Sequence, residues 1–383
     1  MESVYEEALY SIMHRVGKDD FRKEELYLFL KDAFELDEDK HNEILTSVGQ
    51  EKKPQACIEV LVDRAENLIA KDPNGFSDPY CMLGVQVGGG EYIGACDSNN
   101  IAAKEVVTTK VQKATLNPTW QESFTLDVDD VYQDLFHLDI WDEDIEKASV
   151  MTSASKVTEI TSIKGLGRFF KQMAQSTKGS DAQDDFLGCV TVPIKDIPSS
   201  GLHEWLELTS RFSRSSVVRG RIRIDISIHC RERRGKPINS ECDSDEAVHL
   251  YEALLTKFAE HQLQHAQSSL TWSGFIPALA TAILDQVATQ GHISILQKAL
   301  SKWAVFVRIH MTTQLNFRVL LNILLELNSQ WLYTTQQSKR QEKGIVASFE
   351  QFIGYCLRLL AKHRELWPQA TASGQSQMSY MLK

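Results

Sequence analysis

The sequence predicts a multidomain protein in which an all-β antiparallel sandwich is flanked by an N-terminal helical segment and a C-terminal α-helical bundle. Two observations lead to this fold class. Apolar residues recur at three-to-four spacing before residue 53 and after residue 246, as amphipathic helices require. Between these positions apolar and polar residues alternate in short runs separated by turn residues, as half-buried strands require. We therefore expect a helical lead-in over 1–53, a β domain over 54–235 and a helical domain over 246–383.

The lead-in contains two helical patterns separated by the polar residues 17–20. Tyr5, Leu9 and Ile12 mark the first pattern, and Leu26 and Leu30 mark the second. The segment Lys52-Lys53-Pro54 then ends the helical period.

Eight short strands are expected in the β domain. The clearest is 221–229, where four isoleucines point one way and charged or polar residues point the other way. The first begins at Cys57, and the others are expected at 80–85, 106–111, 123–128, 135–141, 186–192 and 205–208. Such a series of short strands and turns predicts an antiparallel sandwich.

The part after residue 246 repeats an amphipathic helical pattern. Helices are expected at 248–258, 276–287, 293–307, 315–332 and 345–366. Apolar stripes of this width are typical of a packed helical bundle.

Composition excludes several classes of protein. The net charge of −11 disfavours a nucleic-acid binder. Seven cysteines are scattered without a CxxC pair, which argues against a disulfide framework and a zinc ribbon, and the N-terminus has no apolar signal-peptide core. These features predict a cytoplasmic protein in a reducing compartment.

Aspartates gather at the ends of the predicted strands. Asp72 and Asp78 flank the first turn, Asp142 and Asp144 follow the strand 135–141, and Asp184 precedes the strand at 186 together with Asp185. Calcium prefers six to eight oxygen ligands, mostly carboxylates, so this pattern predicts a calcium site. The alternative is that these are ordinary turn aspartates.

Four motifs resemble those of C2 domains: Asp-Pro-Asn-Gly-Phe-Ser-Asp-Pro-Tyr (72–80), Leu-Asn-Pro-Thr-Trp-Gln-Glu-Ser-Phe (116–124), Trp-Asp-Glu-Asp (141–144) and Asp-Asp-Phe-Leu-Gly (184–188). The resemblance implies the permuted, phospholipase-type sandwich topology. It also implies that Ca2+ is the cofactor. The implied ligands are Asp72, Asp78, Asp142, Asp144 and Asp185, with Asp184 beside them.

The third loop departs from most C2 domains, because about 145–183 forms a long insert with a predicted helix at 157–175. A helical insert at this place is similar to the central C2 domain of the uncoordinated-13 family of vesicle-priming proteins. We expect the membrane-contacting residues to be Phe76, Phe169, Phe170, Lys164, Arg168 and Lys171. The alternative is that the apolar stripe of the insert packs back on the sandwich.

The flanking helices resemble the same family. The segment Tyr5-Glu-Glu-Ala-Leu-Tyr10 is similar to the lead-in of its non-neuronal branch, the D-type and brain-angiogenesis-inhibitor-associated members, and Leu270-Thr-Trp-Ser-Gly274 is similar to the opening of the MUN domain. A full MUN domain is much longer, so the chain is expected to be an N-terminal part or a short form.

The resemblance implies a protein that binds anionic phospholipid membranes when calcium is present and tethers or primes vesicles for exocytosis. The implied protein partners are SNARE proteins such as syntaxin and a Rab GTPase. Vesicle, endosomal or plasma membranes would hold it peripherally.

Other classes of protein remain as alternatives or are disfavoured. A calcium-independent adaptor would use the same sandwich to bind proteins. No serine or cysteine has a recognisable catalytic context, so we expect no enzyme. His261 and His265 are four residues apart and could share a zinc ion, but we expect them on a solvated helical face.

Overall fold

The computed structural model describes residues 2–86, 88, 103–143, 186–210, 218–238, 241–333, 339–367 and 371–383. The chain divides into two compact units. The sandwich unit comprises Val16–Asp19 and Pro54–Pro237. The helical unit comprises Met1–Arg15, Asp20–Lys53 and Ile238–Lys383.

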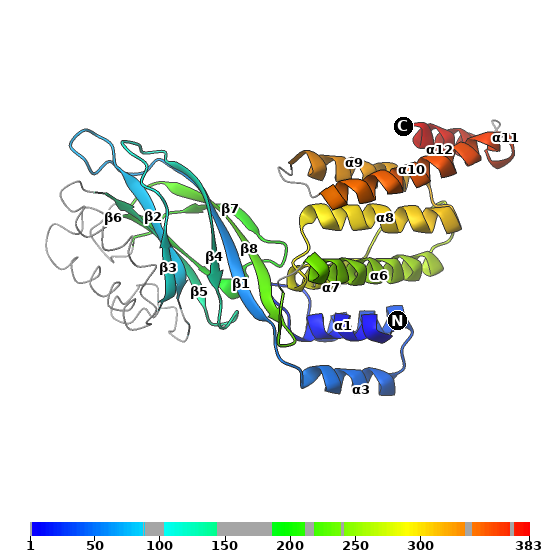
Figure 1. Cartoon of the computed structure of the whole chain (residues 1–383), viewed down its shortest axis with the longest axis horizontal. Coiled ribbons are helices and arrows are strands. Elements are labelled where there is room, and N and C mark those ends of the chain that lie inside the picture. The colour runs from blue at the N-terminus through cyan, green and yellow to red at the C-terminus, as the bar shows by residue number, and fades with distance from the viewer. Residues whose placement is uncertain are drawn as a thin grey trace. The chain divides into compact units, whose positions relative to one another are not determined.

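The sandwich unit is built from antiparallel strands in two sheets (Figure 1). One sheet has the order β4-β1-β8-β7, with β9 paired to β8, and the other has the order β3-β2-β5-β6. The strands are β1 (Gln55–Glu66), β2 (Pro79–Gln86), β3 (Ala103–Thr108), β4 (Thr119–Asp127), β5 (Leu135–Asp142), β6 (Phe186–Pro193), β7 (Leu202–Glu207), β8 (Arg221–Arg233) and β9 (Lys236–Pro237). A short 3₁₀ helix, Ile194–Asp196, follows β6. The predicted antiparallel sandwich with flanking helices is thereby confirmed.

The core of the sandwich lies along β1 and β8. Ile58 pairs with Ile228 in register, and Val60 pairs with Ile226. All four of these side chains are at most 2% exposed. Because successive strand residues alternate between faces, the four isoleucines of β8 all turn to the core. Burying one such side chain is worth about 1.5–3 kcal/mol, which holds the first and last long strands side by side.

The helical unit combines helices from both ends of the chain. Its helices are α1 (Glu2–Met13), α2 (Lys23–Phe34), α3 (Glu38–Gly49), α6 (Glu241–His265), α7 (Ala278–Gln290), α8 (Ile295–Thr313), α9 (Phe317–Tyr333), α10 (Lys339–Ala361), α11 (His363–Leu366) and α12 (Ala372–Leu382). Figure 1 shows them stacked from α3 and α1 through α6 and α7 to α8 and then to α9 and α10. One apolar core runs through this stack, and it includes residues of the lead-in as well as of the C-terminal part.

Gln290 joins the lead-in to the C-terminal helices. The last carbonyls of an α-helix have no partner within the helix. The side-chain amide of Gln290, at the end of α7, donates to the carbonyl oxygens of Ser11 (2.9 Å) and His14 (3.0 Å) at the end of α1. Gln290 is completely buried. Residues 1–53 and 246–383, which the sequence presents as separate segments, therefore share one interior.

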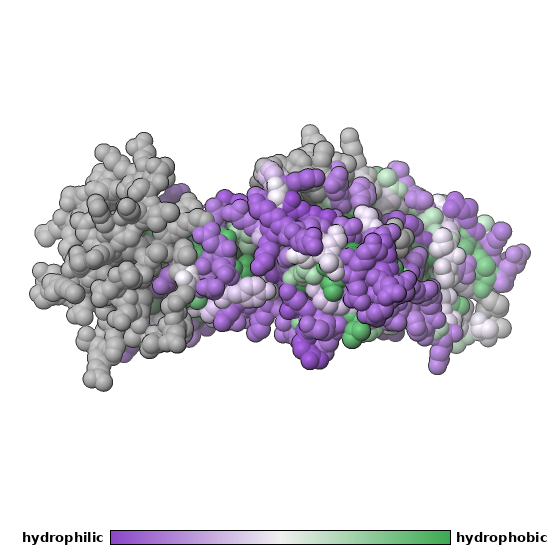
Figure 2. Space-filling view, turned by 90° about the horizontal axis from the view of Figure 1, so that it is seen from below, coloured by the Kyte–Doolittle hydropathy of each residue, from purple (hydrophilic) through white to green (hydrophobic). Residues whose placement is uncertain are grey.

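The surface of the helical unit is largely hydrophilic with apolar residues between (Figure 2). Among the described residues, α10 exposes three large apolar side chains, Val346, Ile353 and Leu357. Its stretch Gly344–Ala361 is also the one described segment that is long and apolar enough, by length and composition, to cross a membrane. A single such helix is weak evidence for a membrane span.

Candidate calcium-binding site

The turn before β2 is closed by hydrogen bonds between its own residues. The Gly75 amide donates to the Asp72 carbonyl oxygen at 3.0 Å, so the turn has Pro73 at its second position and Gly75 at its fourth, as type I turns favour. Gly75 has φ +83°, a conformation that glycine adopts without strain. The Phe76 amide donates to Asn74 Oδ1 at 2.8 Å. The turn therefore holds Asp72 and Phe76 on a defined backbone.

Ser77 fastens this turn to the preceding segment. Its side chain is fully buried, and its hydroxyl donates to the Ile69 carbonyl oxygen at 2.9 Å and accepts from the Lys71 amide at 3.0 Å. These contacts place the next residue, Asp78, directly before the start of β2.

Asp78 and Asp142 meet at one end of the β2–β5 pair. Pro79 pairs with Asp142 in register, which places the end of β5 beside the start of β2. The Asp78 amide donates to Asp142 Oδ1 at 2.6 Å, and the Ala114 amide donates to Asp78 Oδ1 at 2.6 Å. Both aspartates are buried, with 8% and 6% of their surface exposed. The structure thus brings two of the sequence-predicted site residues together.

Burial and neighbouring negative charges both act on the pKa of Asp142. Burial raises this pKa above its ordinary value, and the charges of Asp72 and Asp78 raise it further. The hydrogen bond that Asp142 accepts from the Asp78 amide acts in the opposite direction. A bound cation would favour the ionised form of this carboxyl group and would offset the repulsion between the carboxylates. The donor set of Asp72, Asp78 and Asp142, all hard oxygens, fits calcium.

Two charged residues at this site were not predicted from the sequence. The Lys113 ammonium lies 3.2 Å from Asp78 Oδ2 and also forms an ion pair with Glu143. Glu143 lies inside the motif Trp-Asp-Glu-Asp, so its position was a usable signal. Lys113 had no such signal, because it depends on the segment after β3, where the Gln112 amide donates to the Pro79 carbonyl oxygen.

The remaining predicted site residues divide into two groups. Phe76 is described, and 46% of its surface is exposed beside the aspartates. The others lie outside the described residues: Asp144, Asp184, Asp185, Lys164, Arg168, Phe169, Phe170 and Lys171, together with the predicted insert at 145–183.

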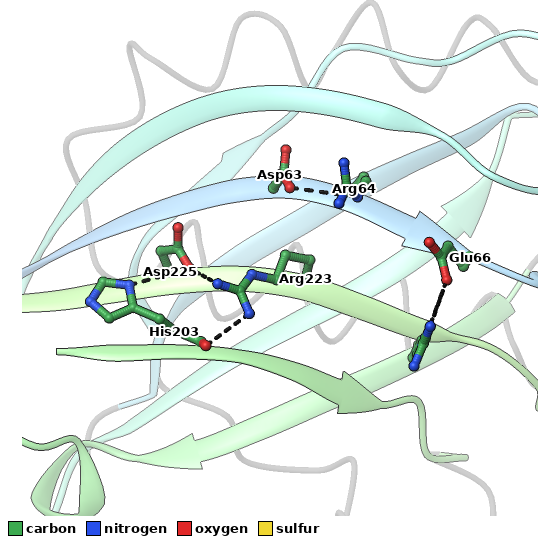
Figure 3. Close-up of polar contacts among 7 residues, drawn as sticks. Asp63, Arg64, Glu66, His203, Arg223 and Asp225 are labelled. Carbon is green, nitrogen blue, oxygen red and sulfur yellow. Dashed lines mark hydrogen bonds and ion pairs between the residues drawn. The ribbon is translucent and has the colours of Figure 1, made fainter. Parts of the chain in front are cut away.

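A second polar cluster covers the outer face of β1, β7 and β8 (Figure 3). Two guanidinium groups lie near the Trp205 ring, with the Arg221 Cζ 4.5 Å and the Arg64 Cζ 5.6 Å from its centroid. Arg221 also pairs with Glu66 at 2.9 Å.

The other charges of this face pair in the same way. Arg223 and His203 each lie 3.3 Å from Asp225 Oδ1. Positive and negative side chains on this face therefore form ion pairs with one another, so the face carries charges of both signs. Sequence alternation indicated that these residues are exposed but not how they pair.

His261 and His265 do not form the solvated pair expected from the sequence. His261 is buried, and its Nε2 lies 3.1 Å from Asp32 Oδ2 of α2. His265 Nδ1 contacts the His261 carbonyl oxygen at 2.8 Å. The expectation was wrong for His261 because the lead-in helix α2, far away in sequence, covers this side of α6.

Comparison with known proteins identifies the β domain and its relatives. The C2 domain family model matches residues 56–156. BAI1-associated protein 3 of Mus musculus is 33% identical over 408 residues, which cover 100% of this chain and 35% of that protein. Protein unc-13 homolog D of Homo sapiens is 30% identical over 394 residues, which cover 99% of this chain and 35% of that protein. The chain spans about a third of the length of these relatives.

Among solved structures, a C2 domain of plant extended synaptotagmin 1 aligns with 49% of this chain and 100% of its own, at 17% identity and a TM-score of 0.29. The homology to BAI1-associated protein 3 and to protein unc-13 homolog D extends along essentially the whole chain, and the chain contains a C2 domain. These findings are consistent with a C2-domain protein of the unc-13 family.

Proposed function

We propose that the sandwich unit binds calcium through Asp72, Asp78, Asp142, Asp144 and Asp185, with Asp184 beside them, and then binds anionic phospholipid. The observation that carries this proposal is the meeting of Asp78 and Asp142, which are 64 residues apart in sequence. The charge of Asp72 acts on the same group, since it raises the pKa of Asp142.

The electrostatic cost of this arrangement supports a cation. At an effective dielectric constant of about 20, two carboxylates about 4 Å apart repel each other by about 4 kcal/mol. Lys113 offsets part of this repulsion at Asp78, but its side chain is 60% exposed and its charge is therefore well screened. A divalent ion held by several carboxylates would offset far more.

Phe76 supports the lipid-binding step. It is exposed between two aspartates of the proposed site, so calcium would neutralise its surroundings and let the ring enter a headgroup layer. Burying about 100 Å² of such a ring is worth about 2.5 kcal/mol. We extend the same role to Phe169 and Phe170, with Lys164, Arg168 and Lys171 as headgroup contacts.

The family points to a role in membrane trafficking or exocytosis. We propose the finer role of tethering or priming vesicles for SNARE-mediated exocytosis, with the C-terminal helices acting as the start of a MUN domain. Syntaxin or another SNARE protein and a Rab GTPase are the proposed partners. The protein would be cytoplasmic and would bind membranes peripherally.

A second candidate is a calcium-independent adaptor whose sandwich binds another protein. Lys113 favours it, because the ammonium group of this lysine already pairs with Asp78 and Glu143. In that case the acidic site would be a structural ion-pair cluster.

Co-sedimentation with vesicles containing phosphatidylserine distinguishes the two candidates. We expect the full chain to sediment with the vesicles in calcium and to remain soluble in chelator. Asp142→Asn should abolish the calcium effect, whereas Asp196→Asn, at an exposed aspartate of the 3₁₀ helix, should leave it unchanged. Equal sedimentation with calcium and with chelator would reject the calcium proposal and favour the adaptor.

A further inference from the structure

Helix α10 has two apolar sides, and only one of them is packed. On the inner side, the Trp303 indole donates to Ser348 Oγ at 3.1 Å, and its ring lies 5.1 Å from the Phe349 ring and 5.3 Å from the Phe352 ring. On the outer side, Val346, Ile353 and Leu357 are 50%, 55% and 61% exposed. A helix that is apolar on both sides is normally buried on both sides, so the outer side is a candidate interface.

Two pairs of residues on the outer side are placed symmetrically about Gly354. Ala347 and Ala361 lie seven residues before and after this glycine, and Glu350 and Arg358 lie four residues before and after it. At 100° per residue all five positions fall on the same half of the helix as the exposed apolar residues. A surface whose halves match in size and are opposite in charge is complementary to itself when turned by 180°.

The small residues leave room for a close neighbour. Among the residues that the structure describes, a methyl group placed on Gly354 would meet only the Arg358 guanidinium, at 3.8 Å, so no other described side chain fills this position. The distance between two packed helices is set by the side chains at the contact. Alanine and glycine along the middle of the face would allow the flanking apolar side chains to interlock.

We propose that α10 pairs antiparallel with α10 of a second copy of this chain, with the two-fold axis at Gly354. In this register Ala347 faces Ala361 of the other copy. Glu350 faces Arg358 twice, once on each side of the axis.

A second copy explains this face better than a lipid bilayer does. The stretch Gly344–Ala361 is long enough to span a membrane, but it carries Glu350 and Arg358, and charged side chains near the bilayer centre are costly. The same two charges are favourable in the antiparallel pair. One helix from each copy makes a small interface, so the expected dissociation constant is on the order of micromolar.

Charge reversal in the full chain tests the pairing, with sedimentation velocity in chelator so that the calcium site plays no part. Glu350→Arg or Arg358→Glu alone should each weaken the dimer about tenfold or more, because each creates two like-charge contacts. The double variant should return to within about threefold of the wild type, and so should an equimolar mixture of the two single variants. Glu260→Arg on α6 and Arg318→Glu on α9, both exposed, are matched controls that should leave association unchanged.

Gly354→Leu provides a second test of the same contact. It should abolish the dimer while leaving the thermal unfolding temperature of the monomer unchanged or higher, since leucine favours a helix more than glycine does. A chain that stays monomeric at about 100 μM, roughly a hundredfold above the dissociation constant expected for so small an interface, would overturn the proposal. So would a dimer that all these variants leave intact. Calcium-independent sedimentation with vesicles that is lost in Gly354→Leu, without any dimer, would assign the face to lipid instead.

Discussion

Asp142 is buried at the end of β5, and burial together with the charges of Asp72 and Asp78 raises its pKa. A carboxyl group whose folded pKa lies above its unfolded value contributes stability at low pH. That contribution is lost as the pH rises through the folded pKa. Ionisation of Asp142 without calcium therefore destabilises the sandwich unit.

Asp142→Asn should stabilise the sandwich unit in chelator, because the amide oxygen can still accept from the Asp78 amide while the charge is gone. The same change combined with Asp144→Asn should abolish the stabilisation by calcium, which at about 100 times the dissociation constant is worth roughly 2.7 kcal/mol in the wild type. Thermal unfolding with and without calcium measures both effects. A calcium-dependent rise in melting temperature that persists in the double variant would contradict the proposed ligands.

Lys113 is the positive group nearest to the proposed ligands that the structure describes, and its ion pair with Asp78 would compete with a metal ion. Lys113→Gln should therefore lower the calcium concentration needed for half-saturation by about two- to fivefold, the range of an exposed ion pair. Isothermal titration calorimetry measures this change. Lys110→Gln, at another exposed lysine of the same segment, is the control. Weaker calcium binding in Lys113→Gln would show instead that the lysine organises the site.

At the scale of single elements, α8 has a buried histidine, His310, in its last turn. His310 Nδ1 accepts from the Leu315 amide at 3.0 Å, so the proton of the neutral ring is assigned to Nε2. The Phe317 ring lies 4.4 Å away and the Tyr355 ring 5.7 Å away. Burial lowers the pKa of His310 to about 4. The neutral ring is thus part of the packing between α8, α9 and α10.

The helical unit should lose stability in acid because of His310. A histidine with a lowered folded pKa contributes fully above the unfolded value of 6.5, and the contribution is lost as the pH falls from 6.5 towards 4. The pKa difference corresponds to roughly 3 kcal/mol. Urea unfolding followed by circular dichroism at pH 7 and pH 4 tests this. His310→Gln should flatten the pH dependence by about that amount, and an unchanged pH dependence would show that His310 is not the group responsible.

Strands and helices were the elements most accessible to prediction. The alternation of isoleucines defined β8, and its buried residues are the ones that alternation selects. The stripe of α10 predicted a helix as well, but its pattern did not reveal that Phe349 and Phe352 are packed while Ile353 and Leu357 are exposed. Periodicity identifies apolar faces, and only the neighbours in space decide which of them is covered.

At the scale of the whole molecule, the helical unit takes its interior from both ends of the chain. Leu9 and Ile12 of α1 belong to the same apolar core as Ile283 and Val287 of α7. Removing the lead-in would expose the side of α7 that α1 covers. It would also remove the donor-acceptor pairs between Gln290 and the end of α1.

Residues 241–383 expressed without the lead-in should therefore bind a hydrophobic dye and self-associate more strongly than the full chain. Adding a fragment of residues 1–53 should reduce dye binding, because α1 and α2 would cover the exposed side of α6 and α7. Dye fluorescence and sedimentation velocity measure these outcomes. A monodisperse, cooperatively unfolding fragment without dye binding would show that the C-terminal helices form a complete core alone.

The sequence by itself determined the local elements of this protein: the alternating strands, the helical stripes, and the turn that carries Asp72 and Asp78 between β1 and β2. These follow from periodicity and turn chemistry, which act over a few residues. Only the tertiary structure decided that Lys113 pairs with Asp78, that α2 buries His261, and that the lead-in shares a core with the C-terminal helices. Each of these contacts joins segments far apart in sequence. They depend on which apolar faces pack together in the folded chain, and this pairing cannot be predicted from a local sequence pattern.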